Sequence, residues 1–374
     1  MRKHLKFIAL VLLAALIMWW FARGLDWNQV STALAAADWR LLALAIVVIS
    51  AGYLIRAFRW RCLLAPLTKA SLRDVFVATT VGFAAIFVFG RAGEVVRPVV
   101  LPLRDRRVRP AASFVTIAVE RICDVALIAL LFALNLLWFP VPAERVAEFA
   151  NIRRSGVILL AAIFLGLLGL AWFRRRSAVA IAWLDRRFKR LSFIPERIAR
   201  ALLHLLEQLA RALSIFVDAR ELLITACWSA SLWLAIGFAT WLVLQAFGLE
   251  FGPKETLFVM CWGLIGSLVP TPGGSAGAFH ATTKYGLHTF LAVDPNKAAA
   301  IAIVMHLIFF GPALIFGLYY FLRGEVSISR VRQLAAPEAV EHAVEDEDLE
   351  ISREPATDAQ WKPSLKQSRE SVGS

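Results

Sequence analysis

Three charged side chains interrupt residues 111–139, an apolar stretch that is otherwise long enough to cross a bilayer. They are Glu120, Arg121 and Asp124, and Glu120 and Asp124 share one helix face because they are four residues apart. Each charge at the centre of a span costs roughly 2.5 to 3.5 kcal/mol, so such groups usually face a cavity or a charged partner. Two interpretations stay open: a substrate site, or an internal salt bridge with Arg121 or Arg91 that only fixes helix packing.

Two arginines flank a glutamate directly after a glycine-broken apolar run, in the sequence GRAGEVVR that begins at Gly90. The planar guanidinium group binds phosphate through two parallel hydrogen bonds, and it does so more strongly in a partly dehydrated cavity than in water. An anchor at the cytoplasmic face would explain Arg97, but it would not require Gly93 and Glu94 beside it. We therefore expect Arg91, Glu94 and Arg97 to receive a phosphate headgroup.

Histidine and lysine side chains form a third group in the second half of the chain. His280 and Lys284 are four residues apart on one helix face, after a turn rich in proline and glycine, and are candidates for proton transfer or headgroup binding. His306, inside the last apolar segment, is more simply explained by a hydrogen bond to a neighbouring helix. Arg56 and Arg59 are interpreted as extending along lipid toward the headgroups, with a place in the same cavity as the alternative.

The elements that must position these groups are membrane helices. The 374 residues are 59% hydrophobic and 18% charged, with a mean hydropathy of +0.66, which is too apolar for a soluble globular protein. Basic loops beside anionic lipid explain the net charge of +13, so nucleic acid is not an expected partner. The four cysteines form no CxxC pair and no histidine stands at metal-ligand spacing, so neither a metal nor a cofactor is expected. The apolar segments are 7–22, 41–58, 75–90, 111–139, 155–173, 222–249, 256–279 and 298–322.

The distribution of lysine and arginine between the loops predicts the topology. The loops richest in these residues are expected in the cytoplasm, together with both termini. Segments 75–90 and 256–279 would then each enter and leave on one side, the first from the cytoplasm and the second from outside. We therefore expect an all-α polytopic membrane protein with about six full spans and two re-entrant broken helices in an inverted repeat. The alternative is that both segments are full spans with glycine kinks. The basic loops are 1–6, 56–73, 91–109, 174–220 and 323–336.

Turn-forming residues break both re-entrant segments. Backbone that leaves a helix inside a membrane must be buried in protein or line a wet cavity, so we expect both breaks to lie inside the protein. The turn-forming residues are Gly90 and Gly93 in the first segment, and Pro270, Pro272, Gly273, Gly274 and Gly277 in the second. The expected units are a first membrane half at 1–139 with a re-entrant element at 75–110, a span and basic amphipathic connector at 140–220, a second half at 221–325 with a re-entrant element at 254–296, and a disordered acidic cytoplasmic tail at 336–374.

Four ordered motifs, YLIRAFRW from Tyr53, GRAGEVVR from Gly90, VERICD from Val119 and VPTPGG from Val269, resemble the lysylphosphatidylglycerol synthase transmembrane family. This family includes the flippase half of the bacterial multiple peptide resistance factor. The resemblance implies a multi-pass protein of the bacterial inner membrane, with broken helices around a central cavity and a role in lipid translocation. His280 departs from the family, whose members usually have a glutamate there. The soluble aminoacyl-transferase domain has no counterpart, so lysyl transfer is not implied.

These observations favour a lipid flippase over two other classes of protein. A membrane phospholipid or a polyprenyl-phosphate lipid would place its phosphate near Arg91 and Arg97, while Glu94, Glu120 and Asp124 balance the arginines or receive a cationic headgroup. One alternative is an ion-coupled small-solute transporter. The other is an intramembrane enzyme or accessory factor acting on a lipid-linked intermediate, although no catalytic domain is recognised. A homo-oligomer is compatible with each of these three functions.

Overall fold

The computed structural model describes residues 16, 19, 21–23, 25–65, 68–108, 110–139, 146–190, 203, 206, 219–269, 271 and 273–324. Every regular element within these ranges is helical, which confirms the expected all-α fold. The N-terminal apolar segment, the acidic tail and most of the basic connector lie outside the described residues, so the expectations for them stay predictions.

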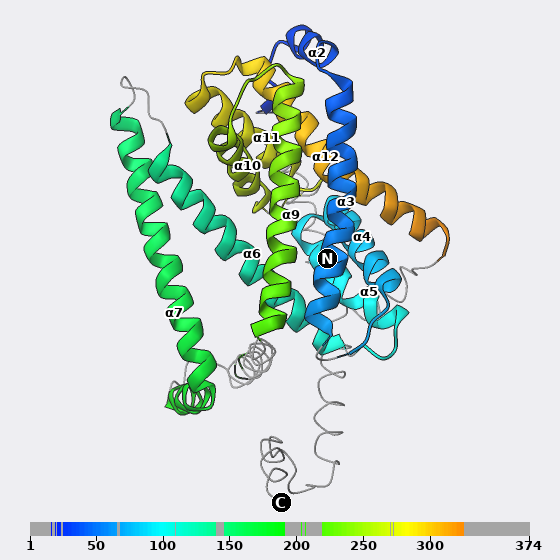
Figure 1. Ribbon diagram of the computed structural model, residues 1–374, viewed down its shortest axis with the longest axis vertical. Coiled ribbons are helices and arrows are strands. Elements are labelled where there is room, and N and C mark those ends of the chain that lie inside the picture. The colour runs from blue at the N-terminus through cyan, green and yellow to red at the C-terminus, as the bar shows by residue number, and fades with distance from the viewer. Residues whose placement is uncertain are drawn as a thin grey trace, which may run out of the picture.

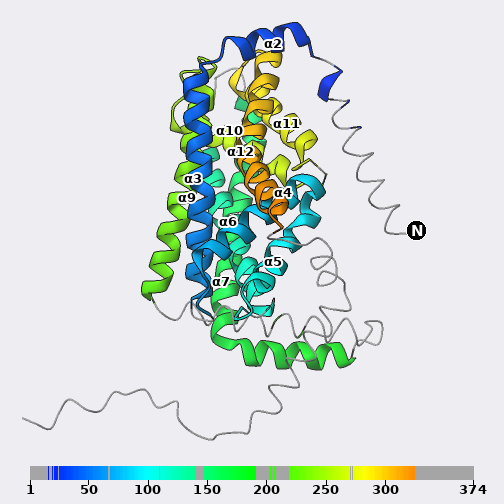
Figure 2. The same ribbon diagram turned by 90° about the vertical axis from the view of Figure 1, so that its right-hand side faces the viewer.

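Two long antiparallel helices pack against each other along one side of the bundle. Helix α3 (Trp39–Leu64) and helix α9 (Ala219–Ala246) pack side by side along most of their length (Figures 1 and 2). Short helix α2 (Trp27–Ala35) lies across one end of the bundle, where Asp26 caps it by accepting hydrogen bonds from two backbone N–H groups (Figure 2). The largest apolar core joins α3 and α9 to the later helices α10, α11 and α12.

Helix α4 (Leu72–Phe89) begins the first helical hairpin. It ends where Gly90 adopts a φ of +64°, a conformation that a residue with a side chain rarely takes. The 3₁₀ helix η1 (Gly90–Val95) turns the chain, and α5 (Val96–Arg104) returns along α4. The helices touch so closely that a Cβ atom on Gly82 would lie 2.6 Å from the Cβ atom of Arg97, and one on Gly93 would overlap the backbone of Ala85. Glycine is therefore required for this hairpin to close.

Helix α10 (Pro253–Ser267) and helix α11 (Ala276–Tyr285) form a second hairpin, followed by the π-helical turn η4 (Gly286–Phe290). Again a glycine permits the close contact, because a Cβ atom on Gly266 would lie 2.5 Å from the carbonyl oxygen of Ala278. Gly273 and Gly274 have positive φ values in the turn, and the hydroxyl of Ser275 donates to the carbonyl of Val269 at 2.6 Å. Gly277 is buried at the start of α11, while Pro270 and Pro272 lie outside the described residues.

The turns of the two hairpins meet inside the bundle. The backbone N–H of Gly274 donates to the carbonyl oxygen of Phe87, near the end of α4, at 2.9 Å. Each hairpin is also flanked by long helices in the same order, α3 and α6 (Pro110–Trp138) around the first, α9 and α12 (Pro295–Leu322) around the second. Figure 1 shows α3 and α12 running down the picture and α9 running up.

Among the described helices, three are long and apolar enough to cross a bilayer: Trp39–Leu64, Leu223–Ala246 and Pro295–Leu322. Helix α7 (Val146–Arg190) contains a shorter apolar part, Arg154–Gly166, and kinks at Arg176. Beyond the kink, α7 runs across the foot of the bundle (Figure 2), which places the start of the basic connector nearly perpendicular to the long helices. The remaining full spans expected from the sequence stay predictions.

Candidate functional site

Five charged side chains from three helices meet in the interior between α3, α5, α6 and α9. They are Arg59, Arg97, Glu120, Arg121 and Asp124, which we call the charge cluster. Arg59, Arg97, Glu120 and Asp124 are buried, although charged groups are rarely buried unless they are paired. The three charges that interrupt α6 in the sequence thus do face charged partners, as the cost of burying them requires.

Arg97 and Glu120 form one half of the charge cluster. The guanidinium of Arg97 donates two parallel hydrogen bonds to Glu120, from Nη1 to Oε1 at 2.7 Å and from Nη2 to Oε2 at 3.0 Å. Its Cζ lies 4.2 Å from the ring centroid of Trp60, whose Nε1 donates to Thr116 at 3.0 Å. Arg97 is thus fixed by a carboxylate on one side and an aromatic face on the other.

Arg59 and Asp124 form the other half. Arg59 donates from Nη1 and Nη2 to the two oxygens of Asp124 at 2.6 and 2.9 Å, and its Nη2 lies 3.0 Å from Oε1 of Glu120. Helix α9 completes the shell, because Trp233 Nε1 donates to Asp124 at 3.2 Å and Ser229 lies 3.3 Å from Arg59. The side chain of Arg59 is 1% exposed, so the interpretation that it extends toward the headgroups is wrong.

Arg121 is the exposed edge of the charge cluster. Its side chain is 32% exposed, and its contacts to Glu120 at 2.8 Å and Asp124 at 3.8 Å both run through Nη2. The charge cluster holds three arginines against two carboxylates, so one positive charge is in excess. Glu94 of η1 attracts Arg121 electrostatically. The backbone of Arg91 belongs to η1, but its side chain lies outside the described residues.

Arg56 stands beside the charge cluster, one turn before Arg59 on α3. Its Cζ lies 4.8 Å from the ring centroid of Phe83 and 6.0 Å from that of Tyr53, and it interacts electrostatically with both Arg121 and Asp124. The described residues give Arg56 no hydrogen bond or ion pair with a carboxylate. Arg56 and Arg121 are thus neighbouring cations whose repulsion Asp124 offsets in part, and a bound anion would offset more of it.

The histidine group lies apart from the charge cluster, at the meeting point of the hairpin turns. Along α4, Gly82 faces Arg97 and Phe87 faces His306, so the two groups differ in level by about 7.5 Å along the helix axis. The ring centroids of His280 and His306 are 4.9 Å apart. Lys284 lies one turn further along α11, and its Nζ is 5.7 Å from the ring centroid of Phe21, which also packs against His280.

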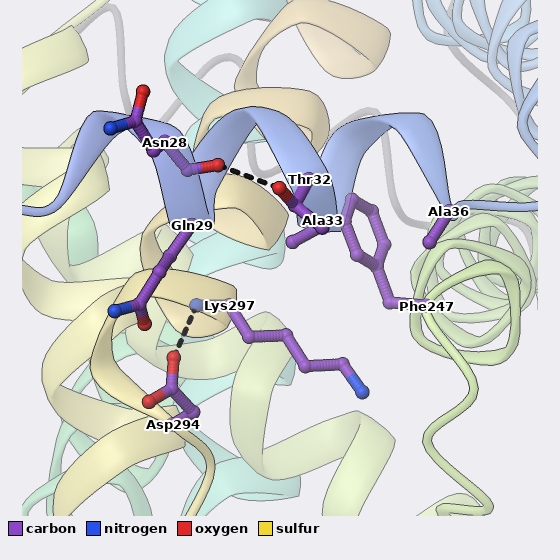
Figure 3. A pocket seen from close by; sticks show the side chains of 8 residues that line it. All are labelled: Asn28, Gln29, Thr32, Ala33, Ala36, Phe247, Asp294 and Lys297. Atoms are coloured by element: carbon purple, nitrogen blue, oxygen red, sulfur yellow. Dashed lines mark hydrogen bonds between the residues drawn. The ribbon is translucent and has the colours of Figure 1, made fainter.

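Described residues line two hollows that lie outside both groups. One of about 450 Å³ opens between α2 and the start of α12, with Lys297 pointing into it (Figure 3). The other, of about 230 Å³, is an apolar groove between α3 and α12. At this level Pro312 interrupts the hydrogen bonding of α12, and the Tyr53 hydroxyl donates to the carbonyl of Phe309 at 2.8 Å. The groove is lined by Ile46, Ser50, Leu307, Gly311, Pro312 and Ile315.

The sequence drew attention to α6 and η1, gave a place in the cavity for Arg59 on α3 only as the alternative, and missed the partners on α9. Ser229 and Trp233 carried no local signal, and Arg59 stands beside two further arginines, Arg56 and Arg61, which favoured the interpretation that it extends toward the headgroups. No group of three or more histidine, cysteine or acidic residues that could hold a metal occurs in the part of the chain that the structure describes.

A family model described as Lysylphosphatidylglycerol synthase TM region matches residues 7–317, a stretch that contains all four ordered motifs, both hairpins and the whole charge cluster. A search of the curated proteins finds no match.

Proposed function

This chain belongs to the lysylphosphatidylglycerol synthase transmembrane family of membrane proteins, and we propose that it is a translocase that moves a phosphate-bearing lipid between the leaflets of the bacterial inner membrane. The observation that carries the proposal is the pair of neighbouring cations, Arg56 and Arg121, at the edge of a buried charge cluster. A phosphate between them would relieve their repulsion and would accept hydrogen bonds from two guanidinium groups.

The two hairpins support this proposal as re-entrant elements. The returning arms are nine residues long in α5 and ten in α11, so they extend about 14 and 15 Å, roughly half of a 30 Å hydrocarbon core. A chain that turns inside the membrane and returns by so short an arm has both ends on the same side. With both termini in the cytoplasm, the matching orders around the two hairpins make an inverted repeat, an arrangement typical of transporters.

The charge cluster gives each arginine a distinct part in the proposed mechanism. Arg97 and Arg59 keep their terminal nitrogens on Glu120 and Asp124, so they hold α3, α5 and α6 together rather than bind substrate. Arg121 shares only its Nη2 with these carboxylates and can turn toward an arriving phosphate. Glu120 and Asp124 still balance the charges of Arg59 and Arg97 while the substrate anion is bound. The bound phosphate faces a cation, so the cost of burying the phosphate is lower than in an apolar cavity without charges.

The apolar groove between α3 and α12 supplies a path for one acyl chain. Ser50 in the groove precedes Arg56 by six residues, a rise of about 9 Å along α3. A lipid with its phosphate at Arg56 could therefore lay the first part of a chain beside Ser50 and Gly311. Nothing lies within 4 Å of a Cβ position on Gly311, so this part of the groove is open.

The test is a scramblase assay on purified protein in liposomes, with dithionite quenching of fluorescent lipids that differ in headgroup. We expect the wild type to move at least one phosphate-bearing lipid, and Arg121→Gln and Arg56→Gln each to lower the rate at least tenfold. Arg40→Gln is the matched control, because Arg40 is an exposed arginine on the same helix as Arg56. A wild type no faster than empty liposomes with every lipid class would overturn the proposal, and uptake of a soluble anion instead would indicate solute transport.

A further inference from the structure

A pair of histidines lies beside the contact between the two hairpin turns and has no part in the proposed lipid site. The rings of His280 and His306 face each other edge to face, with an interplanar angle of 79°. Only 6% of His280 and 3% of His306 is exposed. The surrounding rings of Phe21, Phe279 and Phe310 make the pocket largely apolar.

His306 is connected directly to the contact between the turns. Its Nε2 donates to the carbonyl oxygen of Gly274 at 3.2 Å, and the N–H of the same glycine donates to the carbonyl oxygen of Phe87 at 2.9 Å. The space beside Gly274 is filled by Phe87, His306 and Phe310, each 3.2 to 3.3 Å from a Cβ position on that glycine. A displacement of the His306 ring therefore disturbs the only peptide that bridges the two turns within the described residues.

His280 differs from its neighbour because neither of its ring nitrogens has a hydrogen-bond partner among the described residues. A buried polar group without a partner costs about 1 to 3 kcal/mol, and native structures contain few of them. Phenylalanine would fill the same space without this cost. The structure thus retains an imidazole, a group that binds a proton near neutral pH, where packing alone would favour an apolar ring.

Within the part of the chain that the structure describes, no counter-ion for a protonated His280 lies beside the ring while the two turns are in contact. Of the titratable groups on the elements packed around it, only His306 acts on the ring electrostatically. An imidazolium at His280 would therefore face a second histidine and aromatic rings without a carboxylate, and it would be more stable where the ring reaches water. The other titratable groups on these elements are Lys254, Glu255 and Cys261 on α10, Lys284 and Tyr285 on α11, His288 in η4, and Lys297, Tyr319 and Tyr320 on α12.

We propose that His280 is a proton-binding site whose occupation separates the two hairpin turns. The neutral ring takes a proton from water and becomes an imidazolium, which moves away from His306 and breaks the contact from His306 through Gly274 to Phe87. If the proton is the coupling ion that drives transport, the inference rests on the proposed function. The proton-linked opening of the contact between the turns does not depend on that function.

Amide hydrogen exchange of the full-length protein in lipid nanodiscs tests the opening directly. Once the rates are corrected for the intrinsic pH dependence of exchange, we expect the peptide containing Gly274 to lose protection below about pH 6.5, approaching tenfold per pH unit, the limit for one linked proton. His280→Gln removes the titrating group and should make protection independent of pH. His288→Gln, which changes an exposed histidine of η4, should keep the wild-type response.

Two outcomes would overturn the inference: protection in the wild type that does not change with pH, or a wild-type slope retained in His280→Gln. If His280→Gln does not fold, ring ¹⁵N NMR of the wild type decides the question, because a buried histidine must stay neutral where protection begins to fall and become protonated where the fall levels off. These readouts involve no lipid movement. A protein that opens in acid but moves no lipid contradicts only the proposed function, and one that moves lipid with constant protection contradicts only the proton site.

Discussion

The two helical hairpins of this protein are built alike but surround different interiors. In each, a glycine on the first arm brings the arms into van der Waals contact, at Gly82 in the middle of α4 against Arg97 and at Gly266 near the end of α10 against Ala278. The returning arm of the first hairpin then places an arginine on a carboxylate, whereas that of the second places a histidine with no hydrogen bond. The same hairpin backbone thus holds one polar site whose carboxylates are all paired and one whose histidine has no hydrogen-bond partner among the described residues.

The difference indicates different roles for the hairpins. In the charge cluster, both carboxylates accept bidentate hydrogen bonds from arginine, which makes any rearrangement costly because it would leave a buried charge unpaired. Within the described ranges, separation of the turns beside the histidine pair breaks only two hydrogen bonds, from His306 to Gly274 and from Gly274 to Phe87, and leaves no ion pair broken. We therefore expect the first hairpin to be the rigid part of the bundle and the second hairpin to be the part that moves.

Glu120→Gln should have the largest effect on stability, because it leaves Arg59 and Arg97 buried without one of their carboxylates. Breaking a buried ion pair by removing one partner costs about 3 to 5 kcal/mol. The measurement is equilibrium unfolding of the purified full-length protein in mixed micelles. Glu250→Gln, at an exposed position, serves as the control and should change the free energy of unfolding by less than about 0.5 kcal/mol. Equal losses in the two variants would show that the first hairpin is not held by its charges.

Gly82→Ala and Gly266→Ala test whether the close contact of the arms matters equally in the two hairpins. Each added methyl group would overlap the opposite arm, and overpacking of this kind typically costs about 1 to 3 kcal/mol. Gly166→Ala is the matched control, because this helical glycine of α7 has open space around its Cβ position, so alanine should raise helix stability by up to about 1 kcal/mol.

The same variants also separate the hairpins functionally. Gly82→Ala displaces Arg97 and should impair the charge cluster, whereas Gly266→Ala acts on α11, which carries His280. If Gly82→Ala were as harmless as Gly166→Ala, the contact between α4 and α5 could not be what positions Arg97.

Local sequence was a good guide to the elements of this fold. The glycines at 90 and 93 indicated the break after α4, and the four-residue spacing of Glu120 and Asp124 indicated a polar face on α6. Both depend on backbone conformation and helix periodicity within a few residues. The expected segment at 75–90 accordingly differs from α4 by only a few residues at either end.

The pairing inside the charge cluster could not be predicted in the same way. Arg59 binds Asp124 across 65 positions of sequence, and Trp233 binds the same carboxylate across 109. A buried arginine and one that extends toward lipid headgroups have the same apolar neighbours in sequence, so only the packing of α3 against α6 and α9 distinguishes them. Long-range contacts of this kind depend on how helices assemble rather than on local propensity.

The smallest effect is expected just after α5, at the contact between Asp105 and Arg107. The described residues of the second hairpin have no contact of this kind. Hydrogen bonds from the Arg107 side chain, together with one from its backbone N–H, lower the pKa of the Asp105 carboxyl group. Because this pKa is lower in the folded than in the unfolded chain, the contact stabilises the fold above the ordinary aspartate value of about 3.9 and is lost as the pH falls through the folded value. Asp105→Asn should therefore lower the Tm slightly at pH 7, and the difference from wild type should shrink toward pH 3. A difference in Tm that stays constant over this range would show that Asp105 acts through its shape as an acceptor and not through its charge.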